Sequence, residues 1–424
     1  MVTNSTRQFL RLNALQVYVI LSFATELLLS LAFTVDAVFQ ITVAHLNPLQ
    51  LVLVGTALEL TIFVFEIPTG VLADTKSRRL SIIIGYLLIG LGLIFQGALP
   101  FFGTILLAQL IWGLGYTFTS GATQAWIADE VGPERAEQAF LRGAQAGNLG
   151  GLVAVPLSVW IGLTQPARPI IFGGGAALLL AGFLLLGMPE TGFRPTPVDQ
   201  RRTLAAMKQT LVSARQLTRR RPVLLTLLGI GFFFGLYSEG LDRLWTPHLL
   251  NDVGLPAAAA ARPVLMFGTV RLLELLLSLQ AMEYVRRRAA DRGGSLGSLL
   301  RVLSMAIMVA LVGFGLSGAL GLAVLLYLLI QVMRRVHAPL QDAWLNQHID
   351  DPHVRATMFS TLSQVDAIGQ IGGGPLVGAI ANRISIRAAL VISGLLLSPV
   401  LPLYSAAERD SRASHTPEPG RADE

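Results

Sequence analysis

The chain has 424 residues, of which 53% are hydrophobic and only 14% are charged, and its mean hydropathy is +0.61. Soluble domains carry about 25% charged residues, so these values exclude ordinary soluble, disordered and fibrous proteins. The chain has no cysteine, which excludes disulfide scaffolds, thiol nucleophiles and cysteine-bound metal centres. The net charge of +6 comes from 30 Arg and two Lys set between hydrophobic runs, which favours membrane-topology signals over a nucleic-acid surface.

Twelve apolar runs are long enough to cross a bilayer, which takes about 20 helical residues. The composition and these runs together predict an all-α membrane protein with 12 transmembrane helices. The first run is too long for a secretory signal peptide, and no small-residue cleavage site follows it. In chain order the predicted spans cover 14–43, 49–71, 80–98, 104–126, 138–162, 169–188, 223–248, 262–284, 297–314, 318–340, 355–381 and 384–404.

The positive residues predict the orientation of these spans. Of the 32 Lys and Arg, 26 fall in the tails and the even-numbered connections, and four fall in the odd-numbered connections. The other two, Arg243 and Arg271, fall within spans. By the positive-inside rule this asymmetry places both termini in the cytoplasm.

The longest connection divides the spans into two sets of six. Residues 1–188 are predicted to form an N-terminal six-helix bundle, and residues 222–405 a C-terminal one. The connection, 189–221, begins with prolines and continues with leucines at helical spacing, which predicts a cytoplasmic linker with an amphipathic helix on the inner leaflet. The polar residues 406–424 are expected to form a disordered cytoplasmic tail.

The two halves share a weak internal repeat. Trp126 aligns with Trp344, and after one inserted residue four more positions match: Pro133, Phe140, Gln145 and Gly150 with Pro352, Phe359, Gln364 and Gly369. The matches fall at the end of the fourth and the start of the fifth span of each half. Duplicated six-helix halves are typical of transporters whose substrate site lies between the halves, which predicts two pseudo-symmetric bundles around a central cavity.

The connection between the second and third spans carries a motif. It runs from Gly70 to Arg79, GVLADTKSRR. It resembles the signature loop of the major facilitator superfamily, G-x-L-A-D-R-x-G-R-K/R, and Thr75 and Ser77 depart from it. The resemblance covers about residues 10–405, and it implies a secondary transporter whose two six-helix bundles rock about the central cavity.

The chemistry of this loop predicts an inner latch. Gly70 would let a helix end approach its neighbour closely. Asp74 is a fixed charge that can lie at the positive start of a nearby helix, for which the eleventh span near Arg355 is the candidate. Arg78 and Arg79 can pair with the acids at the end of the fourth span, Asp129 and Glu130. The alternative is that the two arginines only set topology.

Two further family features differ from the proton-antiport drug exporters. Gln109 stands in the fourth span where those exporters often carry Arg. The fifth span has glycines but Asn148 where a Gly-Pro motif is expected, and a Gly-Gly-Pro appears instead at 373–375. The glycines of the fifth span are equally consistent with close helix packing alone.

Charged groups within spans are costly and usually face a cavity or a partner. Glu26, Glu59 and Asp366 have no basic neighbour on their own helix and could carry protons, since burial favours the neutral acid, or could serve packing alone. Glu239 with Arg243 and Arg271 with Glu274 have the i,i+4 and i,i+3 spacings of structural or gating pairs. Asp36 and Asp242 are predicted to lie at an outer gate, Glu66 and Asp342 near the inner end, and His248 and His337 to be hydrogen-bonded structural residues.

These patterns predict a proton-coupled antiporter that exports small amphipathic or hydrophobic compounds from the inner membrane of a bacterium. No cofactor, metal site or catalytic set is expected, so the chain is not predicted to be an enzyme. Its expected partners are protons, a small-molecule substrate and lipid, without nucleic acid, and it is expected to be a monomer. The alternatives are transport of a polar or anionic metabolite held by Arg243 or Arg271, and a non-transporting receptor.

Overall fold

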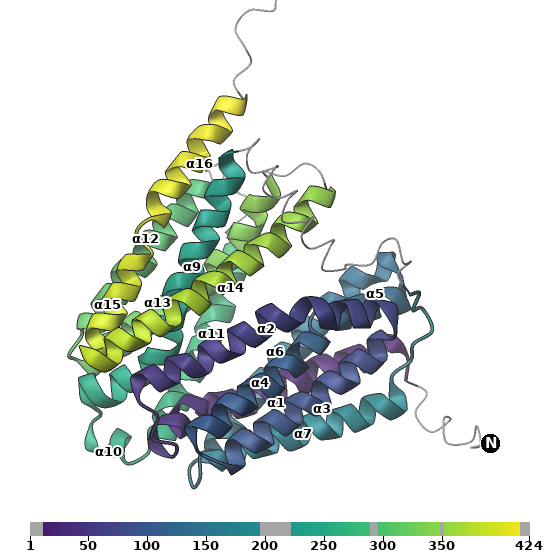
Figure 1. Cartoon of the computed structure of the whole chain (residues 1–424), viewed down its shortest axis with the longest axis horizontal. Coiled ribbons are helices and arrows are strands. Elements are labelled where there is room, and N and C mark those ends of the chain that lie inside the picture. The colour runs from purple at the N-terminus through teal and green to yellow at the C-terminus, as the bar shows by residue number, and fades with distance from the viewer. Residues whose placement is uncertain (1–11, 196–221, 289–295, 348–351, 416–424) are drawn as a thin grey trace, which may run out of the picture. The chain divides into compact units, whose positions relative to one another are not determined.

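The structure is a computed structural model that describes residues 12–195, 222–288, 296–347 and 352–415. All the regular elements in these segments are helices (Figure 1). Contacts divide the chain into two units, each described by itself below. The N-terminal unit comprises residues up to 203 together with 256–272, and the C-terminal unit comprises 204–255 together with the residues from 273 onward.

Seven helices form the N-terminal unit before the central connection. Within it α1 packs on α6 and α7, α3 packs on α4 and α7, and α2 packs on α4. The short helix α5 continues α4 after a break at Gly121, whose φ of 70° favours glycine. The helices are α1 (Ala14–Thr42), α2 (Pro48–Thr75), α3 (Arg78–Ala98), α4 (Phe102–Thr119), α5 (Ala122–Val131), α6 (Pro133–Gly162) and α7 (Ala167–Gly187).

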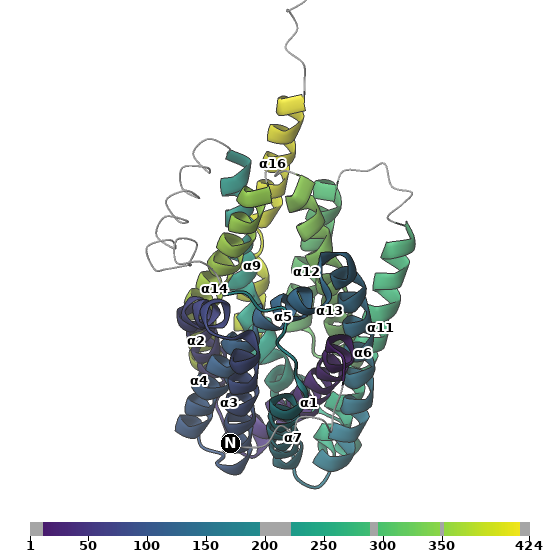
Figure 2. The same ribbon diagram turned by 90° about the vertical axis from the view of Figure 1, so that its right-hand side faces the viewer.

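The remaining helices follow the connection. In the C-terminal unit α14 packs on α9, α12 packs on α13 and α15, and α16 packs on α9 and α12; Figure 2 shows α9 and α14 side by side. The elements are α9 (Pro222–Pro247), the π-helical turn η3 (His248–Gly254), α10 (Ala257–Ala260), α11 (Pro263–Arg288), α12 (Leu296–Leu316), α13 (Leu320–Gln347), α14 (Pro352–Arg383), α15 (Ile386–Leu396) and α16 (Val400–His415). The division between the units falls inside α11.

The sequence specifies where several helices begin. Asn13 and Asn47 each accept a hydrogen bond from the backbone N–H of a glutamine three residues on, and the side chain of that glutamine accepts one from the backbone N–H of the asparagine. Both α1 and α2 therefore start in a capping box. Ser77 caps α3 and Ser385 caps α15 in the simpler way, through the side chain alone.

The helices match the predicted spans in number and order. Ten helices or helix pairs of the described residues are long and apolar enough to cross a membrane, with α4–α5 and α15–α16 each counting as one. The other two predicted spans are the helices α9 and α14, which have 26 and 32 residues. The fold is therefore the all-α membrane fold that the sequence predicts.

The boundaries differ from prediction at two places. Residues 189–195 fold back on the N-terminal unit, as described below, and the predicted amphipathic helix lies at 196–221, outside the described residues. Helix α16 continues to His415, so the expected disorder is wrong for 406–415. One reason is that Glu408 packs against Gly297 of α12, where a Cβ would lie 2.8 Å from the Glu408 side chain.

The predicted internal repeat corresponds to equivalent helix crossings. Gly150 of α6 meets the carbonyl oxygen of Phe23 in α1, and Gly369 of α14 meets that of Phe232 in α9; a Cβ would lie 2.3 Å from the oxygen in both cases. Only glycine allows the two backbones to approach so closely. In each half, the fifth span therefore crosses the first at a glycine that the repeat aligns.

Candidate functional site

The signature loop connects α2 to α3 and holds Arg78 in a network of acceptors. Its guanidinium forms an ion pair with Asp129 of α5, donates to the carbonyl oxygen of Ala125 at 2.8 Å, and lies 3.5 Å from the carboxylate of Asp74. The Arg78 side chain is 14% exposed. The predicted pairing of Arg78 with Asp129 is therefore present within the N-terminal unit.

Arg79 and Glu130 have partners other than each other, so their predicted pairing is wrong. The Arg79 guanidinium donates to the carbonyl oxygen of Leu185 at 2.6 Å, close to the end of α7. Glu130 accepts from the backbone of Thr191 and Gly192, each at 2.6 Å, and from the Thr191 hydroxyl at 2.8 Å. Each residue thus fixes a part of the chain at or beyond α7.

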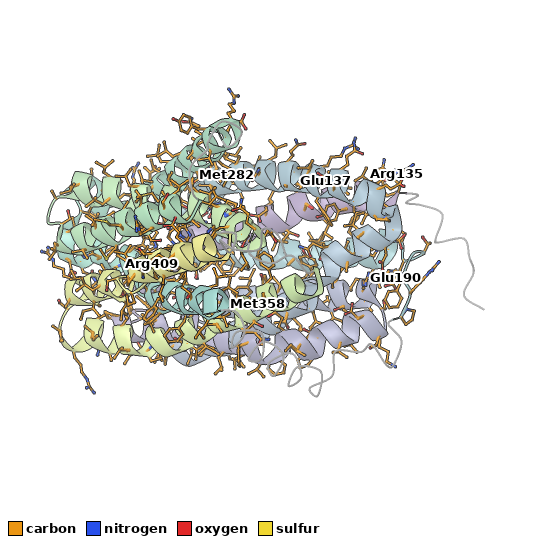
Figure 3. The ribbon with its side chains drawn as sticks, turned by 90° about the horizontal axis from the view of Figure 1, so that it is seen from above. Arg135, Glu137, Glu190, Met282, Met358 and Arg409 are labelled. Atoms are coloured by element: carbon orange, nitrogen blue, oxygen red, sulfur yellow. The ribbon has the colours of Figure 1, made fainter. Side chains whose placement is uncertain are left out.

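The segment Pro189–Gly192 is a part of this network that sequence reasoning missed. Glu190, labelled in Figure 3, accepts from the Ser77 hydroxyl at 2.7 Å and from the Arg79 backbone at 2.9 Å. Trp126 of α5 donates to the carbonyl oxygen of Pro189 at 2.7 Å. A Cβ at Gly192 would lie 2.2 Å from the carbonyl oxygen of Asp129. The sequence signal for this segment was Glu190 and Gly192, which come directly after Pro189 at the end of the sixth span.

A Cβ at Gly70 would have no atom of the described residues within 4 Å, and the close helix approach expected there stays a prediction. The predicted position of Asp74 at the start of the eleventh span stays a prediction, since the side chains at 352–357 lie outside the described ones.

A second network of the N-terminal unit surrounds Asp36. The carboxylate accepts from the amide of Gln40 at 2.8 Å and from the amide of Gln96 in α3. Gln109 of α4 donates to Gln96, and the indole of Trp112 donates to Gln109, both at 2.8 Å. All five side chains are buried. The predicted outer-gate role of Asp36 stays a prediction, but these contacts lie inside the unit and join α1, α3 and α4.

Trp112 fixes which amide groups of this network donate hydrogen bonds and which accept them. An indole N–H can only donate, so Gln109 must present its oxygen to Trp112 and its NH₂ to Gln96. The same logic turns the NH₂ of Gln96 toward Asp36. Gln109 therefore links Trp112 to Gln96 and supplies the carboxylate with a chain of amide donors in place of a cation.

The other predicted acids of this unit lie on α1 and α2. Glu26, near the middle of α1, is exposed, and Gly147 of α6 lies beside it; a Cβ there would be 3.1 Å from Cγ of Glu26. Glu59 and Glu66 of α2 both lie within electrostatic range of Tyr116 in α4. Tyr116 continues an aromatic row with Trp112 and Phe33, whose ring centroids are 6.4 and 5.3 Å apart in that order.

The C-terminal unit brings five charged side chains into one cluster, in which Asp242 and Arg334 lie within electrostatic range of both Glu239 and Asp366. Asp242 of α9 forms a two-pronged ion pair with Arg334 of α13, at 2.5 and 2.9 Å. Glu239 lies 3.5 Å from Arg243 and is 5% exposed, as the predicted i,i+4 pair requires. Asp366 of α14 accepts from the amide of Gln370 at 2.7 Å, and both Asp242 and Arg334 act on it electrostatically.

Arg334 is a member of this cluster that the count of positive charges grouped with a cytoplasmic connection, although it lies within the predicted span 318–340. It lies in the middle of α13, which runs from Leu320 to Gln347, well beyond the predicted end of the span. Arg334 and Arg335 therefore do not count as loop residues, though the asymmetry of the remaining charges keeps its sign. The missed signal was the apolar periodicity that continues through His337, Leu340 and Trp344.

Glu274, of the second predicted pair, lies beside another arginine. That carboxylate is 3% exposed and lies 3.5 Å from Arg335 of α13. The pairing of Arg271 with Glu274 stays a prediction. His337, also on α13, is hydrogen-bonded as predicted, with its Nε2 at 3.1 Å from the Tyr404 hydroxyl and 3.3 Å from that of Ser304.

Helical spans that bury carboxylates and arginines at mid-depth, in two halves related by a repeat, define a membrane transporter. The sequence profile of the Major Facilitator Superfamily matches residues 12–360. The chain therefore belongs to this superfamily, as the signature loop indicated, and it is a transporter rather than an enzyme.

Similar proteins agree with this assignment. An uncharacterized MFS-type transporter of Bacillus subtilis (strain 168), YxaM, is 23% identical over 357 residues, which are 84% of this chain and 87% of that protein. Among solved structures, the D323A mutant of the nucleoside transporter NupG has a TM-score of 0.74 at 14% identity, over 93% of this chain and 100% of that one. An inward-facing bacterial homolog of the human lysosomal transporter Spinster has a TM-score of 0.72 at 15% sequence identity, over 98% of this chain and 100% of that one. At such identities these structures show the fold alone.

Proposed function

We propose that this transporter works by alternating access and couples the export of small amphipathic compounds to the entry of protons. The observation that carries the proposal is the placement of two acids, Glu26 and Asp366, at equivalent crossings of the two halves. The offset that aligns Gly150 with Gly369 also aligns Gly147 with Asp366. Likewise, the offset that aligns Phe23 with Phe232 aligns Glu26 with Gly235.

At each crossing one helix supplies an acid and the other a glycine. Glu26 lies against Gly147, and the carbonyl oxygen of Asp366 would lie 2.0 Å from a Cβ at Gly235. The acid is on the first helix of the N-terminal half and on the fifth helix of the C-terminal half. A carboxylate at mid-helix needs access to water or a partner, so both positions suit groups that exchange protons with an aqueous pathway.

The neighbours of Asp366 favour proton exchange over a fixed ion pair. Its hydrogen-bond donor, the amide of Gln370, carries no charge, so protonating Asp366 leaves no cation stranded beside it. Protonating Asp242 would instead break the two-pronged pair with Arg334 and leave a guanidinium without its partner. We therefore assign proton exchange to Glu26 and Asp366, and assign Asp242 and Glu239 to pairs that hold the arginines.

The N-terminal unit favours amphipathic substrates, and among them cations. The row of Phe33, Trp112 and Tyr116 lies beside the acids of α2. Aromatic rings and carboxylates together attract a lipophilic cation. An anionic substrate has less support, because Arg243 and Arg334 already lie beside carboxylates.

The proposal is tested with the purified protein in liposomes. A fluorescent lipophilic cation is loaded inside, a pH gradient is imposed, and dye efflux and proton flux are recorded together. The proposal expects protons to move inward as dye leaves, and only in liposomes that contain the protein. Dye efflux without proton movement would contradict coupling, and proton flux triggered only by an anionic or nucleoside substrate would contradict the substrate class.

A further inference from the structure

His248 opens the turn η3, and its imidazole is fully buried. Its Nδ1 lies 3.0 Å from a carboxylate oxygen of Asp252, one turn further on. Its Nε2 lies 2.9 Å from the backbone carbonyl oxygen of Phe314, near the end of α12. The Phe314 ring meets the imidazole edge to face, with centroids 4.8 Å apart. One side chain thus connects the end of α9, the turn and the end of α12.

The two partners of this ring impose a condition on its protons. A backbone carbonyl and a carboxylate can accept hydrogen bonds but cannot donate them, and a neutral imidazole has a single N–H. Both contacts can be hydrogen bonds only if the pair holds one more proton than a neutral histidine beside a carboxylate. That proton lies either on the ring, giving an imidazolium, or on Asp252, giving a carboxylic acid that donates to Nδ1.

The extra proton can be exchanged with the solution through Asp252, and the neighbouring charged groups are held in other contacts. Asp252 is 22% exposed, so a proton can reach it from the solution. Arg387 of α15 donates to the backbone carbonyl oxygen of Asp252 at 2.9 Å and holds the turn in place. The elements packed against η3 are α9, α13 and α15, and Phe314 lies on α12. Besides Arg387, the described titratable groups on these helices are Tyr237, Glu239, Asp242 and Arg243 of α9, Arg301 of α12, and Tyr327, Arg334, Arg335, His337 and Asp342 of α13. The Tyr327 ring is 6.2 Å from that of Phe314, Asp242 pairs with Arg334, and Glu239 pairs with Arg243.

We propose that His248 and Asp252 form a proton-operated clasp at the end of the C-terminal unit opposite to α16's terminus. With the extra proton, both hydrogen bonds form and the clasp is closed. When the proton leaves through Asp252, one nitrogen presents a lone pair to an acceptor, and one of the two bonds is lost. The clasp is therefore closed at lower pH and weaker at higher pH.

The clasp is a second proton-binding site, separate from Glu26 and Asp366, and it does not depend on the proposed coupling. Helix α9 carries Glu239, Asp242 and Arg243, and the clasp fastens its far end to α12. Proton release at the clasp would therefore loosen the end of the helix that carries the charged cluster.

Hydrogen–deuterium exchange of the full chain in lipid nanodiscs tests the clasp. Peptides covering 248–254 and 312–316 are followed from about pH 5 to 8, and rates are corrected for the intrinsic pH dependence of exchange. The wild type is expected to lose protection by about five-fold across this range, the effect of one hydrogen bond. His248→Gln should remove the step, because glutamine does not titrate.

Two more variants make the result specific. Asp252→Asn places an amide N–H that can donate to a neutral Nδ1, so both hydrogen bonds form without the extra proton and the step should disappear. His45→Gln, at an exposed loop residue, should keep the wild-type step. The proposal is overturned if corrected protection in the wild type is constant with pH, or if the step persists unchanged in both His248→Gln and Asp252→Asn.

Discussion

Gly235 of α9 lies directly against the backbone of Asp366 in α14, where a Cβ would be 2.0 Å from the carbonyl oxygen. The equivalent crossing of the other half has the two residue types exchanged, with Gly147 on α6 and Glu26 on α1. The repeat therefore keeps a glycine-to-acid contact at each crossing while moving the acid from one helix to the other.

Replacing this glycine should separate α9 from α14. Gly235→Ala forces a methyl group onto a backbone oxygen that cannot move independently, and overpacking of this kind costs about 1–3 kcal/mol. Thermal unfolding of the purified protein is expected to shift downward. Gly372→Ala is the matched control, since it lies on α14 with no atom within 4 Å of its Cβ position and should be neutral or stabilising. Equal effects of the two variants would contradict the close contact.

In the Asp36 network, a change at the central Gln96 should lower the stability of the protein more than a change at the terminal Trp112. Gln96→Leu leaves both the Asp36 carboxylate and Gln109 short of a buried partner, with a cost of about 2–5 kcal/mol. Trp112→Phe removes only the terminal donor, and the amides can then reorient, so the hydrogen-bond loss is about 1 kcal/mol. The comparison is made by thermal unfolding in detergent. A Trp112→Phe variant less stable than Gln96→Leu would contradict the donor chain.

Glu190 should stabilise the signature loop, although the two are far apart in the sequence. Glu190→Ala removes the acceptor of Ser77 and of the Arg79 backbone, and is expected to destabilise the N-terminal unit by about 1–3 kcal/mol. Limited proteolysis near 189–195 should become faster. Glu137→Ala, at an exposed residue of α6 labelled in Figure 3, is the control and should leave both measurements unchanged. A Glu190→Ala variant as protease-resistant as the control would show that the segment is held by other contacts.

Asp242 and Arg334 should be energetically coupled. Each single change, Asp242→Asn or Arg334→Gln, leaves a charge at mid-helix without its partner, while the double variant removes both charges. We expect the double variant to be more stable than the sum of the single effects by about 1–3 kcal/mol, measured in a double-mutant cycle. Additive effects would mean that the pair contributes nothing beyond its separate residues.

The sequence predicts the helices, their order, the family and the pair Arg78–Asp129, because these depend on apolar length and a local motif. It does not predict which partner a long side chain selects. Arg79 binds the end of α7 and Glu130 binds the segment after it, and both contacts depend on how the chain leaves α7. Arg334 was hidden for a different reason. It lies within the predicted span 318–340, but a positive residue this close to the end of an apolar run was counted as a topology signal, and the helix continues to Gln347.

The internal repeat, too, predicts only part of what the structure has at the proposed proton sites. Five aligned residues were enough to suggest two related halves, and Gly150 and Gly369 proved to make the same backbone contact. The correspondence between Glu26 and Asp366 could not be seen from the alignment, because the two acids occupy different helices of the repeat. It becomes apparent only when each acid is seen beside its glycine.

The central claim is that Glu26 and Asp366 exchange the coupling protons. It is tested most directly by comparing uphill dye export driven by a pH gradient with energy-independent exchange of dye across liposomes of equal pH. We predict that Glu26→Gln and Asp366→Asn abolish the first and retain the second, while Glu283→Gln, at the α11 ion pair with Arg287 outside the proposed sites, retains both. Full pH-driven export by both Glu26→Gln and Asp366→Asn would contradict the account.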